Sequence, residues 1–275
     1  MVPLLESKEL TIDWLIENKK SVLAAKKSAV KYADSIIAAP AIFPIDQRST
    51  NNKGLLNNGP EDIEDDEIKE LKAQLIINTT NVMDSHNDVH IPGLWKKSLS
   101  ENNIFYLCQE HEFSFSGIIS DNIIASTKKM SWNKINAPFE GNTEALIYDA
   151  IISKKRNPFM FDQYLNKYVR NHSVGMMYVK INMCVDDERY TEEKGNWDKY
   201  YKEVANKDEA DSLGYFFAVT EAKIIEGSAV TRGSNRYTPT QSIEENKNEP
   251  EQSTLIIEPE QSTQKVTNII NPNLF

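Results

Sequence analysis

Ser173 has the residue type and the setting of a candidate nucleophile. It lies in the strand-like run 171–179, which Gly175 interrupts. A glycine inside a strand often marks a place where backbone or ligand approaches closely. Side chains alternate along a strand, so Ser173 and Gly175 share one face and His172 lies on the other. His172 is therefore a poor base for its own neighbour.

A serine nucleophile in this strand needs a histidine from elsewhere in the chain to take its proton. Of the four histidines, His111 is the best placed, because it ends the predicted strand 105–111 and follows the acidic Glu110. Each residue also has an ordinary interpretation. Ser173 would then be a small packed residue of a strand, and His111 a surface or core histidine.

Two pairs of histidine and cysteine residues have the residue types of zinc ligands. His86 and His90 are four residues apart, and Cys108 and His111 are three apart. Zinc accepts these ligand types. The first pair shares a face only on a helix, which the neighbouring turn residues disfavour, and the second points to opposite faces of a strand. The same alternation argues against Cys108 as a nucleophile. We predict no metal ion and no cofactor.

Alternating and helical patterns predict an α+β domain over residues 73–240. A polar loop at 84–95 leads into a short helix. The predicted strands are 75–77, 105–111, 117–119, 123–125, 171–179, 214–225 and 227–231, and the predicted helices are 142–155, 161–169 and 197–204.

The flanking segments differ from this domain in composition. Residues 1–39 are predicted to be a helical extension, with a helix at 7–38 whose lysine-rich face either docks to an acidic partner or is simply solvated. Residues 40–72 are predicted to be a linker followed by a short acidic helix. Residues 241–275 form a low-complexity acidic tail, expected to be disordered, with a short apolar end. Glu-Pro-Glu-Gln-Ser-Thr occurs there twice, at 249–254 and 258–263.

The composition restricts the class of protein. The chain has 275 residues, a formal net charge of -10 and two cysteines. The excess of acidic over basic residues argues against a nucleic-acid binder, which needs a basic face. No apolar run reaches membrane-spanning length, and the N-terminus lacks the order of a signal peptide. Two cysteines in a long chain are typical of free thiols in a reducing compartment. We expect a soluble intracellular protein.

Four separated segments resemble the prohead (capsid maturation) serine proteases of tailed bacteriophages. Residues 84–95 are similar to the family's Asp-x-x-x-Asp-x-x-x-Pro-Gly motif, and residues 107–117 to the strand that ends in its catalytic histidine. Residues 172–176 resemble its Leu-Ser-Ile-Gly-Phe strand. Residues 220–235 resemble its Leu-x-Glu-Val-Ser-x-Val-Thr-x-Pro-Ala-Asn signature. The chain departs from the pattern at three places: Glu112 replaces an aspartate, Phe115-Ser116-Gly117 replaces a Pro-Ile-Gly turn, and Gly233-Ser234 replaces Pro-Ala.

The resemblance implies a fold and a site. The fold would be an antiparallel β-barrel of the type found in the herpesvirus protease assemblin, flanked by helices. His111 would be the base, Ser173 the nucleophile and Glu226 the third member of a triad. Backbone N–H groups of the turn at Ser234 and Asn235 would stabilise the oxyanion.

The resemblance also implies a function. The protein would be a serine endopeptidase inside the immature capsid (prohead) in the host cytoplasm, with the virion as a second location. It would cleave segments of the scaffold and major capsid proteins, and itself, and it would self-associate. The portal is a further candidate partner, whereas a membrane or a specific nucleic acid is not expected. The alternative is a virion structural protein that retains the protease fold without the chemistry.

Overall fold

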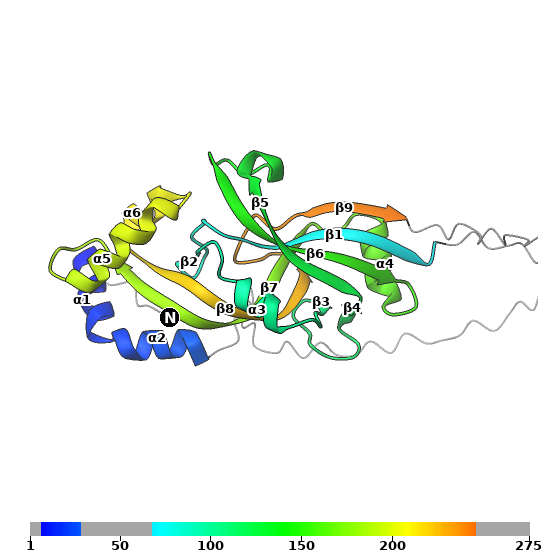
Figure 1. Cartoon of the computed structure of the whole chain (residues 1–275), viewed down its shortest axis with the longest axis horizontal. Helices are drawn as coiled ribbons and strands as arrows, with labels where there is room; N and C mark the ends of the chain where they lie inside the picture. Colours follow the sequence, from blue (N-terminus) through cyan, green and yellow to red (C-terminus); the bar gives the residue numbers. More distant parts are fainter. Residues whose placement is uncertain (1–6, 29–67, 246–275) are drawn as a thin grey trace, which may run out of the picture.

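The computed structural model describes residues 7–28 and 68–245, which form two open β-sheets with helices at both ends (Figure 1). The first sheet has the order β5-β6-β1-β9 and is antiparallel throughout. Its strands are β1 (Glu70–Thr79), β5 (Ile123–Ser131), β6 (Asn142–Ser153) and β9 (Thr240–Glu245).

The second sheet is organised around one long strand, β8 (Tyr215–Val230). Along one edge, β8 pairs antiparallel with β7 (Asn171–Val185). It also pairs in parallel with two short strands, one at each half of its length. These are β2 (Asp88–His90) and β3 (Leu107–Gln109), and β3 pairs in turn with β4 (Ile118–Ser120).

The α+β class is confirmed, but the expected closed antiparallel barrel is not found. A barrel needs unbroken pairing around its circumference. In the described residues the outer strands of the two sheets share no ladder and meet only at an isolated bridge between Asn171 of β7 and Pro239, just before β9. The β2–β8 and β3–β8 pairs are parallel. The three-residue strands β2 and β3 each cover only part of one edge of β8, so they cannot close the sheet.

The main core lies between the two sheets. Odd-numbered residues of β1, such as Leu75 and Ile77, pack in one cluster with Tyr148 of β6 and with Val174 and Met176 of β7. The opposite face of the first sheet is covered by a smaller cluster around the buried Trp132 of a short 3-10 helix, Trp132–Ile135. The second half of β1, residues 75–79, is therefore buried on both faces, whereas the edge strands β5 and β9 are largely exposed.

Helices occupy both ends of the long β7–β8 pair. In Figure 1, α1, α2, α5 and α6 lie at one end and α4 at the other. Their bounds are α1 (Lys8–Glu17), α2 (Lys19–Ser28), α3 (Lys96–Glu101), α4 (Pro158–Leu165), α5 (Thr191–Tyr200) and α6 (Lys207–Leu213). No helix in the described part of the chain is long and apolar enough to span a membrane.

The predicted helix 7–38 is two helices that meet at Asn18, and residues 29–38 lie outside the described ranges. α1 buries Ile12 in the main core. Two lysines of α2 contact acids of the same chain. Lys19 Nζ lies 2.6 Å from Glu193 Oε1, and Lys26 binds Asp88, whose side chain is fully buried.

Other predicted elements also need correction. Residues 142–155 were predicted to be a helix but form β6, because pairing with β1 on one side and β5 on the other outweighs a local pattern that fits both structures. The predicted tail begins inside β9, since residues 242–245 pair with β1. Of the predicted acidic helix 61–72, residues 61–67 lie outside the described ranges and Glu70–Lys72 belongs to β1. The linker from 40 and the tail from 246 also lie outside them.

Candidate active site

The pairing of β7 with β8 places Ser173 on the same face as two polar residues of β8. Ser173 is opposite Ser228, and Gly175 is opposite Glu226. Residues directly opposite in an antiparallel pair point to the same face, with Cβ atoms roughly 4.5–5.5 Å apart. The side chains of Ser173, Ser228 and Glu226 therefore gather on one face of the second sheet.

His111 reaches this face from a strained turn. β3 runs parallel to β8, with Cys108 opposite Ser228. The strand ends at Gln109, not at His111 as predicted. Glu110 and His111 then take left-handed conformations, with φ of 47° and 60°. Each such residue costs on the order of 1–3 kcal/mol, and such strain is typical of functional sites.

Hydrogen bonds hold this turn against β8. The Glu110 N–H donates to the Ala229 carbonyl (2.9 Å), and the His111 N–H donates to Ser228 Oγ (3.2 Å). The Glu112 N–H closes the turn on the Gln109 carbonyl (2.8 Å). The strand that supplies Glu226 and Ser228 thus also fixes the backbone of the histidine.

Glu226 is the centre of the site. Its side chain is fully buried. Oε1 lies 2.6 Å from His111 Nδ1, and Oε2 accepts a hydrogen bond from Ser228 Oγ at 2.5 Å. A carboxylate beside Nδ1 stabilises the tautomer with the proton on Nδ1, in which Nε2 is the unprotonated nitrogen. The geometry is that of a base oriented by an acid.

Gly175 makes room for this carboxylate. A Cβ at position 175 would lie 2.1 Å from Glu226 Oε1, the oxygen that contacts His111. The carboxylate therefore lies directly over the backbone of β7, two residues from Ser173 on the same face. The prediction that this glycine marks a close approach is confirmed.

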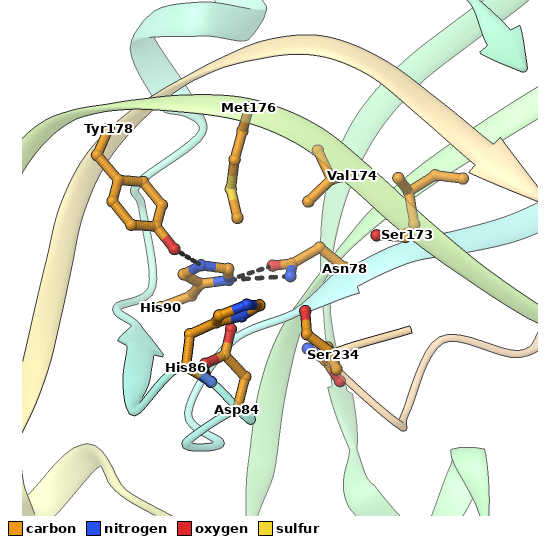
Figure 2. A pocket seen from close by; sticks show the side chains of 11 residues that line it. Asn78, Asp84, His86, His90, Ser173, Val174, Met176, Tyr178 and Ser234 are labelled. Carbon is orange, nitrogen blue, oxygen red and sulfur yellow. Dashed lines mark hydrogen bonds between the residues drawn. The ribbon is translucent and has the colours of Figure 1, made fainter. Parts of the chain in front are cut away.

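Ser173 also lies at the edge of a small hollow that reaches the other side of the strand (Figure 2). Val174, Met176 and Tyr178 form one wall, and Asn78 and His90 lie across from them. Only about 10 Å³ of the hollow admits the centre of a water-sized sphere. That is about what one water molecule needs.

The polar groups of this hollow are bonded to one another. His90 Nδ1 lies 2.9 Å from Asn78 Nδ2, and His90 Nε2 lies 3.4 Å from the Tyr178 hydroxyl. Tyr178 donates to Asp88 Oδ2 (2.8 Å). Burial lowers the pKa of His90 to about 4. Burial, followed by repulsion from Asp88, raises the pKa of Asp84 to about 7.

The two residues predicted near the oxyanion also line this hollow. Ser234 and Asn235 border it together with Ser173. The Asn235 side chain is buried and joins two segments of the fold, since its Nδ2 donates to the Thr79 carbonyl at 2.8 Å. The structure brings both residues near Ser173, and their role as oxyanion donors stays a prediction.

The remaining candidates are poorly suited to chemistry here, because burial acts against their charged forms. His172 is fully buried between Tyr164 and Thr238, with Nε2 3.0 Å from the Tyr164 hydroxyl, and burial lowers its pKa to about 4. Burial raises the pKa of the Cys108 thiol to about 12. Across residues 7–28 and 68–245, no three histidine, cysteine, aspartate or glutamate side chains form a group suited to a metal ion.

Sequence reasoning missed Ser228. Its hydroxyl connects the Glu226 carboxylate to the His111 backbone. Strand alternation was the available signal, because residues 226 and 228 share a face of any regular strand.

Comparison with known proteins gives no match. No protein-family model matches the chain, and neither does a curated protein or a solved structure.

Proposed function

We propose that this protein is a serine endopeptidase with Ser173 as nucleophile, His111 as base and Glu226 as the acid that orients the base. One observation carries the proposal. The fully buried Glu226 carboxylate lies 2.6 Å from His111 Nδ1, on the face of the sheet that carries Ser173. A nucleophile, a base and a third group that orients the base are the recurring parts of covalent acyl transfer.

The mechanism follows from these roles. The Ser173 hydroxyl attacks the carbonyl carbon of the scissile peptide bond while His111 Nε2 takes its proton. The C–N bond then breaks, and the imidazolium returns the proton to the leaving amine. Water attacks the acyl-enzyme by the same route in reverse, which releases the acid and regenerates Ser173. Glu226 stabilises the imidazolium in both steps. A backbone donor at the turn of Ser234 and Asn235 would contribute about 3 kcal/mol to oxyanion stabilisation.

The proposed setting is maturation of a phage capsid. The support is the spatial meeting of segments that resemble the prohead proteases: the turn of His111, the strand of Ser173 and the Glu226–Ser228 segment are far apart in sequence and adjacent in space. We propose that the assemblin-related fold is present in an opened form. The substrates would be scaffold and major capsid segments and the chain itself, inside the prohead.

A second candidate is a virion structural protein without activity. The low exposure of the His111 side chain, 7%, favours it, as do the departures at Glu112 and Gly233 from the resembled family. Such a protein would keep the Glu226 hydrogen bonds for stability alone. A reagent that reacts only with activated serines separates the two candidates.

The test uses a fluorophosphonate reagent and intact-mass analysis. Wild type and Ser100→Ala, a change in an exposed serine of α3, should each gain one label at Ser173, and Ser173→Ala should gain none. Co-expressed with its capsid and scaffold proteins, the wild type should shorten them or itself, and Ser173→Ala should not. Folded wild type that neither reacts nor shortens any partner would favour the structural protein.

A further inference from the structure

A groove runs beside β9, at the edge of the first sheet. β9 pairs with β1 on one side. Its other side faces residues 167–170, which approach it where Thr240 Oγ1 donates to the Val169 carbonyl (2.8 Å). The groove between them has a volume of about 470 Å³. An extended segment fits such a site, because an open strand edge offers backbone donors and acceptors for pairing.

The lining of the groove defines the chemistry of its occupant. Lys167 and Arg170 contribute two exposed cations, and Val169 and Ile243 contribute partly buried apolar side chains. Glu244 and Glu245, at the far end of β9, have the opposite charge, so attraction for an anion must come from the side of Lys167 and Arg170. The best ligand is an extended segment with both carboxylates and aliphatic side chains.

We propose that the groove binds the chain's own acidic tail, through residues 249–260. This segment has the required composition: Glu249 and Glu251 precede the apolar Leu255-Ile256-Ile257, and Glu258 and Glu260 follow it. The tail begins directly after β9, and only three residues separate Glu245 from Glu249. Such a short tether gives an effective concentration on the order of millimolar, so weak contacts are enough for docking.

Comparison with the opposite edge of the same sheet shows why we assign the tail to β9. β5 is also an edge strand and also carries exposed lysines, Lys128 and Lys129. It has neither the adjoining basic segment nor the chain continuation that β9 has. Both edges therefore carry positive charge. Only the β9 edge also has a lined groove and a direct connection to the tail. This inference does not depend on the proposed proteolysis.

Zero-length cross-linking of lysine to carboxylate in the full chain tests the proposal. Lys167 should form several-fold more cross-links than Lys128 to the four tail glutamates 249, 251, 258 and 260, as located by mass spectrometry. Equal yields at the two lysines would overturn docking. The reaction should be run on a mixture of isotopically light and heavy chains. Cross-links confined to mixed pairs would assign the groove to a second copy and overturn the proposal as well.

A charge exchange provides the matched control. Lys167→Glu with Arg170→Glu should make the β9 amides exchange faster with solvent, by removing the docked segment. Adding Glu249→Lys and Glu251→Lys to that variant should restore slow exchange. Both cations are exposed, so these changes leave the core intact. Unchanged β9 exchange in the double variant would contradict the proposal.

Discussion

Two histidine-centred clusters lie on opposite faces of β7, and their partners differ. His111 lies 2.6 Å from a carboxylate, whereas His90 contacts the amide of Asn78 and the hydroxyl of Tyr178. A carboxylate does lie near His90, but Asp88 is already bonded to Lys26 and Tyr178. Because Asp88 is engaged in this way, the effect of burial dominates at His90. Burial lowers the pKa of His90 to about 4, so this histidine is neutral. An acid makes a histidine a useful base only if its charge is not already compensated.

Neutralising each acid in turn is the strongest test of the difference between the two histidine clusters. Glu226→Gln keeps the shape of the side chain but removes the charge that stabilises protonated His111, so the rate of Ser173 labelling should fall about 10³–10⁴-fold. Asp88→Asn should instead lower stability, because Lys26 loses its buried partner, and should leave the labelling rate of folded protein nearly unchanged. An equal loss of labelling in both variants would contradict the assigned roles.

A second change displaces the carboxylate without altering it. Gly175→Ala places a methyl group about where Glu226 Oε1 lies, so we expect peptide cleavage to fall roughly 10²–10³-fold through misalignment of His111. Gly195→Ala in α5 is the matched control, because nothing lies within 4 Å of its Cβ position. That change should keep activity and stabilise the helix by about 0.5–1 kcal/mol. Full activity in Gly175→Ala would show that the carboxylate position is not needed.

The third prediction concerns pH and the buried His172. Burial lowers its pKa from 6.5 to about 4, so the folded state binds this proton less readily than the unfolded chain. Its neutral form therefore stabilises the fold above about pH 6.5, and this contribution is lost as the pH falls towards 4. The slope is about 1.4 kcal/mol per pH unit. Below pH 6.5, the difference in free energy of unfolding between His172→Phe and wild type should grow in favour of His172→Phe.

Urea unfolding from pH 4.5 to 7.5 measures this difference. Asp84 has a raised pKa of about 7, which acts in the opposite direction: its contribution is present at low pH and is lost as the pH rises. Because Asp84 is common to both proteins, its contribution cancels in the comparison. Parallel stability curves would show that His172 is not held neutral by the fold.

The smallest expected effect is that of Ser228→Ala. The variant loses one hydrogen bond to Glu226 and the acceptor of the His111 N–H, so the labelling rate should fall about tenfold, since His111 and Glu226 are less well aligned. Ser120→Ala is the control, because Ser120 is also a buried serine and donates to the Ile151 carbonyl (2.6 Å). A similar stability loss is expected there, with the labelling rate unchanged. The NMR signal of the His111 Nδ1 proton should shift in Ser228→Ala alone.

The sequence was a good guide where local patterns agree with tertiary pairing. Local patterns predicted the strand of Ser173, the close approach at Gly175 and His111 as the best-placed histidine. Glu226, which the structure brings to His111, was implied only by the resemblance to a known family. The sequence failed as a guide where pairing decides. The apolar spacing of Leu146, Ile147 and Ala150 fits a helix or a strand, and only the partners β1 and β5 select the strand.

The lack of barrel closure and the support of the histidine could not be predicted from local patterns. Closure of a β-barrel depends on the length over which strands far apart in sequence pair with each other. The spacing of apolar residues does not predict this length. The left-handed turn at Glu110 and His111 has no glycine or asparagine to indicate it. It exists because Ser228 and Ala229 accept its backbone N–H groups.

The position of β8 has a consequence for when the site can exist. β8 supplies Glu226 and pairs with β7, the strand that carries Ser173. It also pairs with β3, which leads into the turn of His111. A register slip of one residue would send Glu226 and Ser228 to the opposite face together. Formation of the site is thus an all-or-none event coupled to completion of the sheet. A nascent or partly unfolded chain carries the same three residues without the arrangement that would make them reactive.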